Sequence, residues 1–247
     1  MQILKKLIIA GALCASLTSV SAETVRVGTE SAFPPFEFFD SQKGEITGFD
    51  IDLIKLLGQQ AGFDVEIVQM GFDAIIPAMM TGTVDAGIAG FSITPERAKK
   101  VLFSNPYYDS GLSVLIRLED KGKVNSIDDL KNQTVCVQLG TSGAMQAAKI
   151  PGATVRNFNN INEAFLELQN RGCRAVVGDR PVNGYFMVSR PQNNKHFYHL
   201  PQTLQAEQYA VVFAKTNPQL RDRINNALRD IKANGEYDKL YRKWFGQ

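Results

Sequence analysis

The feature of the sequence that most constrains its fold is the alternation of short apolar segments with longer amphipathic ones. The short segments are rich in β-branched residues, as strands are, and lie at 24–28, 64–68, 84–90, 112–116, 134–138, 154–158, 174–178 and 210–214. Helical periodicity lies between them, and one predicted helix places Phe49, Leu53, Ile54 and Leu57 on one face. Because alternating strands and helices form parallel sheets covered by helices, the sequence predicts an α/β fold.

Two further segments have the periodicity of amphipathic helices. Ala164, Leu166 and Leu168 fall in one of them, and the other runs from Asn217-Pro218 to Gly235. The second segment has a capping residue, a first-turn proline and a glycine just past its end, where helices favour them. Its apolar stripe consists of Leu220, Ile224, Leu228 and Ile231.

The N-terminal segment MQILKKLIIAGALCASLTSVSA has the pattern of an export signal. Lys5 and Lys6 precede an apolar run from 7 to 17, and the small residues that end at Ala22 suit signal peptidase. A membrane anchor would need about 20 apolar residues, which this run does not reach, and bulky Leu13 disfavours lipid attachment at Cys14. We therefore expect residues 1–22 to be cleaved after about Ala22 and the mature protein to be periplasmic.

The charge of the mature chain excludes a nucleic-acid partner. Loss of Lys5 and Lys6 leaves 25 basic and 25 acidic residues of the original 27 and 25, so the formal charge falls from +2 to zero. A neutral chain lacks the basic surface of a nucleic-acid-binding protein. Cys136 and Cys173 remain in a compartment that permits disulfides; a bridge is possible, but the preferred prediction is two small buried thiols.

Four predicted strands are followed by a glycine or a polar side chain. These strand ends are Gly28-Thr29-Glu30 with nearby Phe33, Gly90-Phe91-Ser92 leading to Arg97, Gln138 with Gly140-Thr141-Ser142, and Gly178-Asp179. Ligands of parallel α/β sheets bind beyond the carboxyl ends of the strands. Four such ends, with one arginine and two acids, predict a shared cleft.

The residues of this cleft suit a ligand that carries both charges. Arg97 is set early in a predicted helix, where the macrodipole disfavours a cation, so we expect it to meet an incoming carboxylate together with backbone N–H groups. Asp179 suits an ammonium group, and Phe33 and Phe72 suit the walls. Each residue also has an ordinary structural interpretation: Arg97 pairing with Glu96 on a solvated face, Asp179 capping a helix, and the two phenylalanines packing in a core.

From Glu23 to Gln247 the sequence resembles the periplasmic substrate-binding proteins of polar amino-acid ABC transporters, and among them the glutamine-binding proteins. The stretches that carry the resemblance are AFPPFEF (32–38), GFDIDL (48–53), FDAIIPAM (72–79), VDAGIAGFSIT with ERAKK (84–100), FSNPYYDSGL (103–112), LGTSG (139–143) and NGEYDKLYRKWFG (234–246). Each motif is short, but their ordered series spans the whole predicted mature chain.

The resemblance implies a type II periplasmic binding protein with two α/β lobes that close on a ligand by hinge motion. The lobes would be joined by crossings near 107–112 and 205–210. Lobe one would hold 23–108 plus 209–247 and lobe two 109–208. The resemblance also implies a monomer without a cofactor that delivers an amino acid to the permease subunits of an ABC transporter.

Residue by residue, the resemblance assigns roles to the cleft. It places Arg97, Ser92 and Gly90 on the ligand carboxylate, with Thr141 and Ser142 assisting from the second lobe. It places Asp179 on the α-ammonium, where Gly90 and Ser92 also help. Phe33 and Phe72 would be the aromatic walls.

Three positions depart from the glutamine-binding pattern, which tends to have Asp, Lys and His where this chain has Glu30, Gln138 and Gly178. Without the lysine, Glu30 has no cationic partner in the predicted cleft, and a ligand cation about 4 Å away would gain roughly 4 kcal/mol at an effective dielectric constant near 20. We therefore expect a basic amino acid, namely arginine, lysine, ornithine or histidine, whose side chain is recognised by Glu30. Glutamine is the alternative ligand. With a glutamine ligand, Glu30 would accept an amide N–H and Gln138 would donate.

An alternative from another class is an exported cyclohexadienyl or arogenate-type dehydratase on the same fold, for which Glu30 or Glu207 would be the general acid. Asp179 argues against it, because a dicarboxylate substrate would favour a second cation there. His196 and His199 lack neighbouring ligands for a metal, and no phosphate loop or nucleophile elbow is present. The sequence thus predicts a binding protein, not an enzyme.

Overall fold

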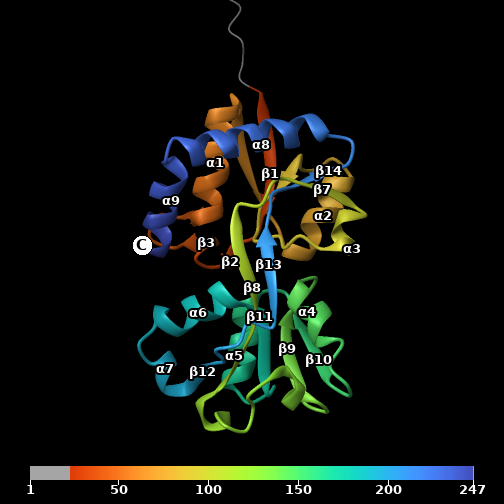
Figure 1. The fold of residues 1–247 in the computed structure, drawn as a ribbon, viewed down its shortest axis with the longest axis vertical. Coiled ribbons are helices and arrows are strands. Elements are labelled where there is room, and N and C mark those ends of the chain that lie inside the picture. The colour runs from red at the N-terminus through yellow and green to blue at the C-terminus, as the bar shows by residue number, and fades with distance from the viewer. Residues whose placement is uncertain (1–22, 247) are drawn as a thin grey trace, which may run out of the picture.

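The computed structural model describes residues 23–246, which form two lobes stacked along the long axis of the molecule (Figure 1). The predicted signal peptide, residues 1–22, lies outside the described residues. The predicted α/β class is confirmed. Within residues 23–246 there is no helix whose length and apolar content would let it span a membrane.

Lobe one, the upper lobe in Figure 1, contains a five-stranded sheet in the order β5-β1-β6-β14-β7. Its strands are β1 (Thr24–Thr29), β5 (Asp64–Gln69), β6 (Ala86–Gly87), β7 (Val101–Phe103) and β14 (Val212–Ala214). A second small sheet contains β2 (Ala32–Phe33), β3 (Glu37–Asp40) and β4 (Glu45–Thr47). The helices of this lobe are α1 (Phe49–Ala61), α2 (Phe72–Met80), α3 (Pro95–Ala98), α8 (Pro218–Ala233) and α9 (Glu236–Phe245).

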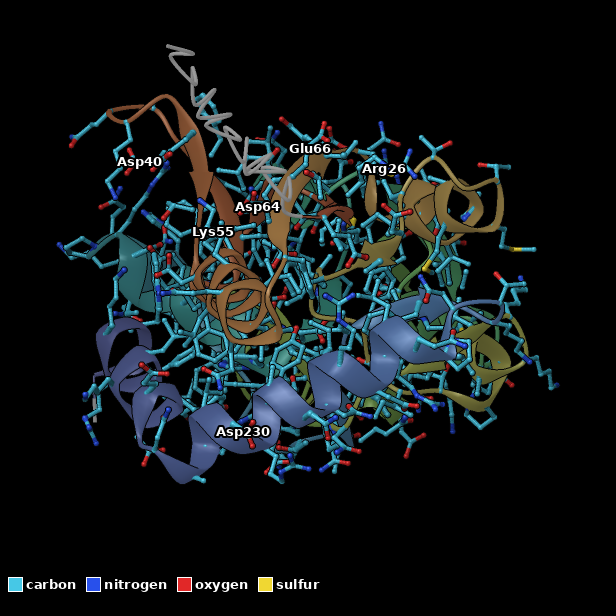
Figure 2. All side chains as sticks on the ribbon, turned by 90° about the horizontal axis from the view of Figure 1, so that it is seen from above. Arg26, Asp40, Lys55, Asp64, Glu66 and Asp230 are labelled. Atoms are coloured by element: carbon cyan, nitrogen blue, oxygen red, sulfur yellow. A yellow bond between two sulfur atoms is a disulfide. The ribbon has the colours of Figure 1, made fainter. Side chains whose placement is uncertain are left out.

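Helix α8 forms where its end signals predict. The Asn217 side chain accepts a hydrogen bond from the backbone N–H of Leu220, and Gly235 follows the helix with φ 83°, a left-handed conformation that glycine adopts readily. The predicted apolar stripe is buried against α1, and Figure 2 shows α8, with the labelled Asp230, lying across lobe one.

Lobe two contains a sheet in the order β10-β9-β11-β8-β12, with β13 paired to β8. Its strands are β8 (Tyr108–Arg117), β9 (Thr134–Gln138), β10 (Thr154–Phe158), β11 (Ala175–Asp179), β12 (Phe197–His199) and β13 (Gln205–Tyr209). The helices are α4 (Ser142–Ala147), α5 (Ile161–Gln169), α6 (Arg180–Ser189) and α7 (Asn193–His196), with short 3₁₀ helices at Leu118–Asp120 and Ile127–Leu130. In α5, Ala164 and Leu168 are buried but Leu166 is 56% exposed.

The lobes are joined by β8 and β13, which run side by side between them (Figure 1). The two strands are antiparallel, from Gln205 opposite Leu112 to Tyr209 opposite Tyr108. At the lobe-one end the Tyr108 and Tyr209 rings stack with centroids 5.7 Å apart, and Phe36 meets both edge to face. This aromatic contact fixes the crossing strands to lobe one.

The prediction of wholly parallel sheets is wrong for two strands. β1 is parallel to β5 and β6, and β9 to β10 and β11, but β14 is antiparallel to β6 and β8 is antiparallel to β11. β8 and β14 adjoin the crossings, so they enter their sheets from the opposite lobe and not through a covering helix. Local sequence pattern does not encode that direction.

Cys136 of β9 and Cys173 are joined in a disulfide, so the preferred prediction of two unpaired thiols is wrong. Both residues are buried in lobe two, as expected. Parallel pairing places β11 beside β9, with Val176 opposite Cys136, and Cys173 lies just ahead of β11. The bridge thus depends on strand pairing between segments 37 residues apart.

Candidate functional site

The predicted strand ends meet at one small cavity between the lobes. Its lining side chains nearly fill it: about 10 Å³ is open to the centre of a water molecule, which is room for about one water. All of the predicted site residues except Glu30 line it, and Ala89 lines it as well although the sequence did not predict it. The lining consists of Phe33, Phe72, Ala89, Gly90, Ser92, Arg97, Gln138, Thr141, Ser142 and Asp179. Those up to Arg97 come from lobe one and those from Gln138 onward come from lobe two. Both lobes are therefore needed to build the cavity.

Arg97 is a buried residue of the lining, and none of the ion pairs within residues 23–246 involves it. Its Nη1 donates to the Ser92 carbonyl at 2.8 Å, and its Nη2 reaches the Gly140 carbonyl of the other lobe at 3.1 Å. The guanidinium carbon lies 5.2 Å from the Phe72 ring centre and 5.3 Å from that of Phe91. The interpretation of Arg97 as a surface partner of Glu96 is therefore wrong.

The helix around Arg97 is shorter than expected. α3 is a single turn whose N-cap, Thr94, accepts from the Arg97 backbone N–H. One turn has too few aligned peptides for a sizeable macrodipole. What sets Arg97 apart is its burial without a carboxylate partner: burial lowers the pKa of its guanidinium, and Asp179 and Glu207 oppose this effect. An arginine remains charged even so.

The walls of the cavity are aromatic and tightly fitted. Phe72 stacks on Phe91 with ring centres 4.6 Å apart, and both Phe33 and Phe72 are buried in hydrophobic clusters as well as lining the cavity. Gly90 has φ +55°, and a Cβ there would lie 2.8 Å from the Phe33 ring. A side chain at position 90 would therefore be strained and would displace this wall.

Asp179 ends β11 and faces the cavity. It precedes α6 but makes no capping hydrogen bond with its side chain, so the capping interpretation is wrong. Its Oδ1 accepts from the Tyr209 hydroxyl at 2.6 Å. Burial, reinforced by nearby Glu207, raises the pKa of Asp179 to about 7. A ligand ammonium would restore its charged form.

Glu30 does not line the cavity but contacts Gln138, which does. The Gln138 Nε2 donates to Glu30 Oε2 at 2.8 Å and weakly to the Asn159 carbonyl at 3.4 Å. The two remaining oxygens, Glu30 Oε1 and Gln138 Oε1, are buried and have no hydrogen-bond partner among the described residues. Burial raises the pKa of Glu30 to about 7, and Asp179 and Asp73 add to the rise.

The hydroxyl groups of the site are already engaged. Thr141 is the N-cap of α4: its Oγ1 donates to the Gln138 carbonyl and accepts from the Ala144 N–H. Ser92 and Ser142 both donate to Oε2 of Glu207, a residue of β13 that is 7% exposed. From sequence, Glu207 is a candidate only for an enzymatic acid, and its one signal is that it is a lone acid on a crossing segment.

Two acids lie beneath the Gly90 turn. Asp50 of α1 accepts through Oδ2 from the Gly90 N–H at 2.9 Å and from the Tyr107 hydroxyl at 2.7 Å. Glu37 is fully buried beside it, and burial together with the Asp50 charge holds the pKa of Glu37 well above its usual range. Burial also raises the pKa of Asp50 to about 6. Asp50 thus connects Gly90, which lines the cavity, to Tyr107 at the start of the first crossing.

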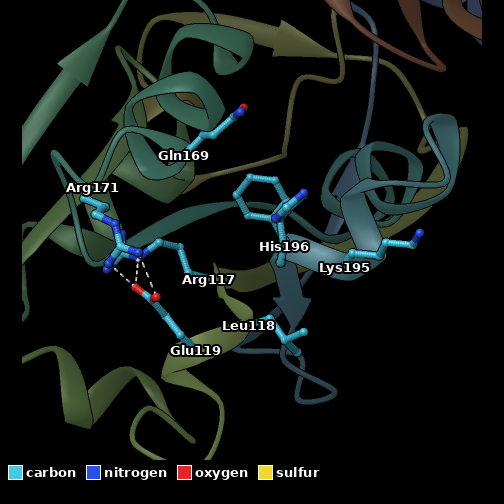
Figure 3. A pocket seen from close by; sticks show the side chains of 8 residues that line it. Arg117, Leu118, Glu119, Gln169, Arg171, Lys195 and His196 are labelled. Atoms are coloured by element: carbon cyan, nitrogen blue, oxygen red, sulfur yellow. Dashed lines mark hydrogen bonds and ion pairs between the residues drawn. The ribbon is translucent and has the colours of Figure 1, made fainter.

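A more open hollow lies on lobe two beside α7 (Figure 3), and it shares no lining residue with the inter-lobe cavity. It is lined by Arg117, Glu119, Arg171, Lys195 and His196 among others. Figure 3 shows Glu119 between the two arginines, and it pairs with both. Arg117 also pairs with Asp120, so both arginines of this hollow already have carboxylate partners. Arg97 has none, so the inter-lobe cavity is the better candidate site. The other histidine, His199, bonds through Nε2 to Ser113 Oγ at 2.7 Å.

Two lobes joined by two crossing strands, with an inter-lobe cavity lined by a buried arginine and a buried aspartate, define a two-lobed periplasmic-type binding protein. The family described as "Bacterial extracellular solute-binding proteins, family 3" matches residues 25–247, and the chain belongs to it. The ABC transporter arginine-binding protein 1 of Escherichia coli (strain K12) is 32% identical over 99% of this chain and 100% of its own.

Solved structures agree in fold. An ancestral arginine-binding protein bound to arginine is 41% identical, with a TM-score of 0.84 over 90% of this chain and 98% of its own. An ancestral arginine-binding protein bound to glutamine is 40% identical, with a TM-score of 0.85 over 92% and 100%. These relatives are named as binding proteins and not as enzymes, which supports the prediction of a non-enzymatic protein over the dehydratase alternative.

Proposed function

We propose that this protein captures a basic L-amino acid outside the cytoplasmic membrane by lobe closure and delivers it to the permease subunits of an ABC transporter. Arginine, lysine, ornithine and histidine are the candidate ligands. The names of the relatives support an amino-acid ligand and a transporter partner. The preference for a basic side chain is supported by the unpartnered oxygens of Glu30 and of Gln138, which lines the cavity.

The observation that carries the proposal is a pair of buried acceptors without donors. Glu30 Oε1 and Gln138 Oε1 have no partner, while the Gln138 amide N–H groups are directed at Glu30 and Asn159. An unsatisfied buried acceptor costs roughly 1–3 kcal/mol. A guanidinium or ammonium group carries donors alone and can satisfy both oxygens.

The charges around the cavity favour the same class of ligand. Arg97 is the one basic residue of the lining, and the carboxyl groups of Asp179 and Glu207 lie near its guanidinium. Glu30 adds a third carboxyl group, in contact with Gln138 of the lining. A zwitterion leaves this excess of acids unchanged, whereas a basic amino acid adds one positive charge. The α-carboxylate would bind Arg97, and the α-ammonium would bind Asp179, as proposed for the site as a whole.

Glutamine is the second candidate, favoured by the relative that is bound to it. Its amide N–H groups would satisfy Glu30, but its amide oxygen would need a donor, and the Gln138 N–H groups are already engaged. A buried polar group without a partner weakens binding. We therefore place glutamine after the basic amino acids.

We further propose the lobe boundaries as 23–108 plus 209–247 for lobe one and 109–208 for lobe two, cleavage after about Ala22, and a monomer. The pairing of β8 with β13 between the lobes supports these boundaries.

The experiment is calorimetric titration of ligand-stripped, refolded protein against the twenty amino acids and ornithine. The expected result is tight binding of one or more basic amino acids with at least tenfold weaker binding of glutamine, a difference of about 1.4 kcal/mol. Submicromolar glutamine binding without a response to arginine or lysine would refute the basic-ligand proposal. Light scattering of the same samples tests the monomer.

A further inference from the structure

Glu207 occupies an unusual position for a carboxylate. It lies in the middle of β13, opposite Ser110 of β8, on one of the two strands that connect the lobes. It is 7% exposed, yet none of the ion pairs within residues 23–246 includes it. Its hydrogen-bond donors are the side chains of Ser92, Ser142 and, at 3.3 Å, Gln205.

The two serines reach Glu207 from different lobes. Ser92 follows β6 in lobe one, and Ser142 begins α4 in lobe two. Their Oγ atoms lie 2.5 Å and 2.9 Å from the same carboxylate oxygen, Oε2. Both serines also line the cavity. One oxygen of the crossing strand therefore holds one hydroxyl from each lobe at the edge of the site.

These bonds determine what the hydroxyls can offer to a ligand. A serine hydroxyl has one proton and two acceptor lone pairs. A carboxylate can only accept, so Ser92 and Ser142 must both direct their protons at Glu207. The two serine hydroxyls can then offer only their oxygen lone pairs to a ligand in the cavity. An α-ammonium carries donors and can use them, whereas an α-carboxylate carries acceptors and cannot.

We propose that Glu207 is a positioning residue that makes Ser92 and Ser142 acceptors for the α-ammonium of the ligand and ties that contact to both lobes. The inference rests on the proposed function, since it requires a ligand with an α-amino group. It also revises the role expected for Ser142, which moves from the carboxylate to the ammonium beside Asp179.

The α-carboxylate of the ligand still has hydrogen-bond donors when the two serines act only as acceptors. Arg97 uses Nη1 and Nη2 to reach the Ser92 and Gly140 carbonyls. A guanidinium has five N–H donors, so further donors remain for a carboxylate. The Thr141 hydroxyl donates its proton to the Gln138 carbonyl and adds no donor.

The first experiment compares two ligands on one variant. L-arginine and 5-guanidinopentanoate differ only in the α-amino group, and both are titrated calorimetrically into wild type and Ser142→Ala. Ser142→Ala should weaken L-arginine about tenfold, the effect of one hydrogen bond to a charged group, and leave 5-guanidinopentanoate unchanged. Equal weakening of both ligands, or no weakening of either, would overturn the proposal.

The second experiment tests Glu207 itself. Glu207→Ala should weaken L-arginine about tenfold or more because the serine protons become free to turn. Glu207→Gln should recover most of the affinity because its carbonyl oxygen can still accept from both serines. Asp109→Ala is the matched control, because Asp109 is an exposed acid on β8 that pairs with Gln208.

Coupling between the residues separates positioning from a general structural effect. Ser142→Ala should cost about tenfold in wild type and less than about twofold in the Glu207→Ala background, as coupled neighbours do. Glu207→Ala that binds like Asp109→Ala would overturn the inference. If thermal unfolding shows that Glu207→Ala does not fold, the two-ligand comparison decides alone.

Failure of the proposed function gives a different result. If wild type prefers glutamine, the basic-ligand proposal fails, and the same Ser142→Ala comparison with L-glutamine and glutaramate still tests Glu207, because the α groups are shared. If wild type binds no amino acid, both proposals fail. If wild type binds L-arginine and Ser142→Ala weakens its deaminated analogue equally, this inference fails alone.

Discussion

Replacement of Glu30 by glutamine is the sharpest test of how the protein selects a side chain. Glu30 is 4% exposed, its Oε2 accepts from Gln138, and its Oε1 has no partner. Glutamine keeps the shape of the side chain and one acceptor but removes the charge and adds an amide donor. The variant thus isolates the electrostatic contribution of Glu30 to ligand choice.

The expected loss follows from the geometry. A hydrogen bond to a charged group contributes about 1.5–3 kcal/mol when buried, which corresponds to roughly a ten- to hundredfold fall in affinity for L-arginine. L-glutamine carries no side-chain charge, so its affinity should change by less than about threefold. The ratio of the two affinities should therefore move toward glutamine.

The assay is calorimetry at pH 8, where wild-type Glu30 is ionised, with thermal unfolding as the test of folding. Glu66→Gln is the control, because Glu66 is an exposed acid on β5 and its loss changes the net charge by the same amount. An unchanged affinity for L-arginine, or an equal fall for both amino acids, would refute the role given to Glu30.

Three further predictions concern pH, the carboxylate anchor and the disulfide. Burial raises the pKa values of Glu30 and Asp179 to about 7, so the affinity for L-arginine should be constant between about pH 8 and 8.5 and should fall as the pH drops through 7. The fall should reach about tenfold per pH unit for each carboxyl group that must lose a proton before the ligand binds. A flat profile in titrations from pH 6 to 8.5 would contradict this. Arg97→Met should lower affinity by roughly a hundredfold, about 3 kcal/mol, in calorimetry, and retained capture would remove the basis of the site. Replacing Cys136 and Cys173 together by serine opens a loop of 37 residues and should lower the free energy of unfolding by about 4 kcal/mol in urea titrations, whereas an equal stability would contradict the expectation.

Much of the fold follows from local patterns in the chain. Strands β1, β5, β9, β10 and β11 lie within a residue or so of the predicted segments, because β-branched apolar runs and capped amphipathic helices are local signals. The small sheet of β2, β3 and β4 was not predicted, since AFPPFEF reads as a turn-rich segment with little alternation. The direction of β8 and β14 was predicted wrongly because it depends on the route of the chain between lobes.

Some residues of the candidate site can be predicted from the sequence, and others can be recognised only in the folded structure. Polar residues that follow strands could be identified one by one, and the carboxyl ends of neighbouring strands then bring Gln138, Ser142 and Asp179 to one cavity. Glu207 could not be assigned a role from sequence, because its partners Ser92 and Ser142 lie 115 and 65 positions away. The Glu37 and Asp50 pair beneath Gly90 was missed for the same reason.

The sequence by itself determined the class of fold and the strand ends that carry polar groups, and it predicts Arg97 as the residue that binds a ligand carboxylate. Only the tertiary structure decided that Cys136 bonds to Cys173, that Arg97 is buried without a carboxylate partner, and that the two serines give their protons to Glu207. The physical reason is the distance along the chain over which each kind of interaction acts. Backbone preference and amphipathic periodicity act over a few neighbouring residues, whereas the donor or acceptor role of a side chain is set by whichever group the folded chain places against it.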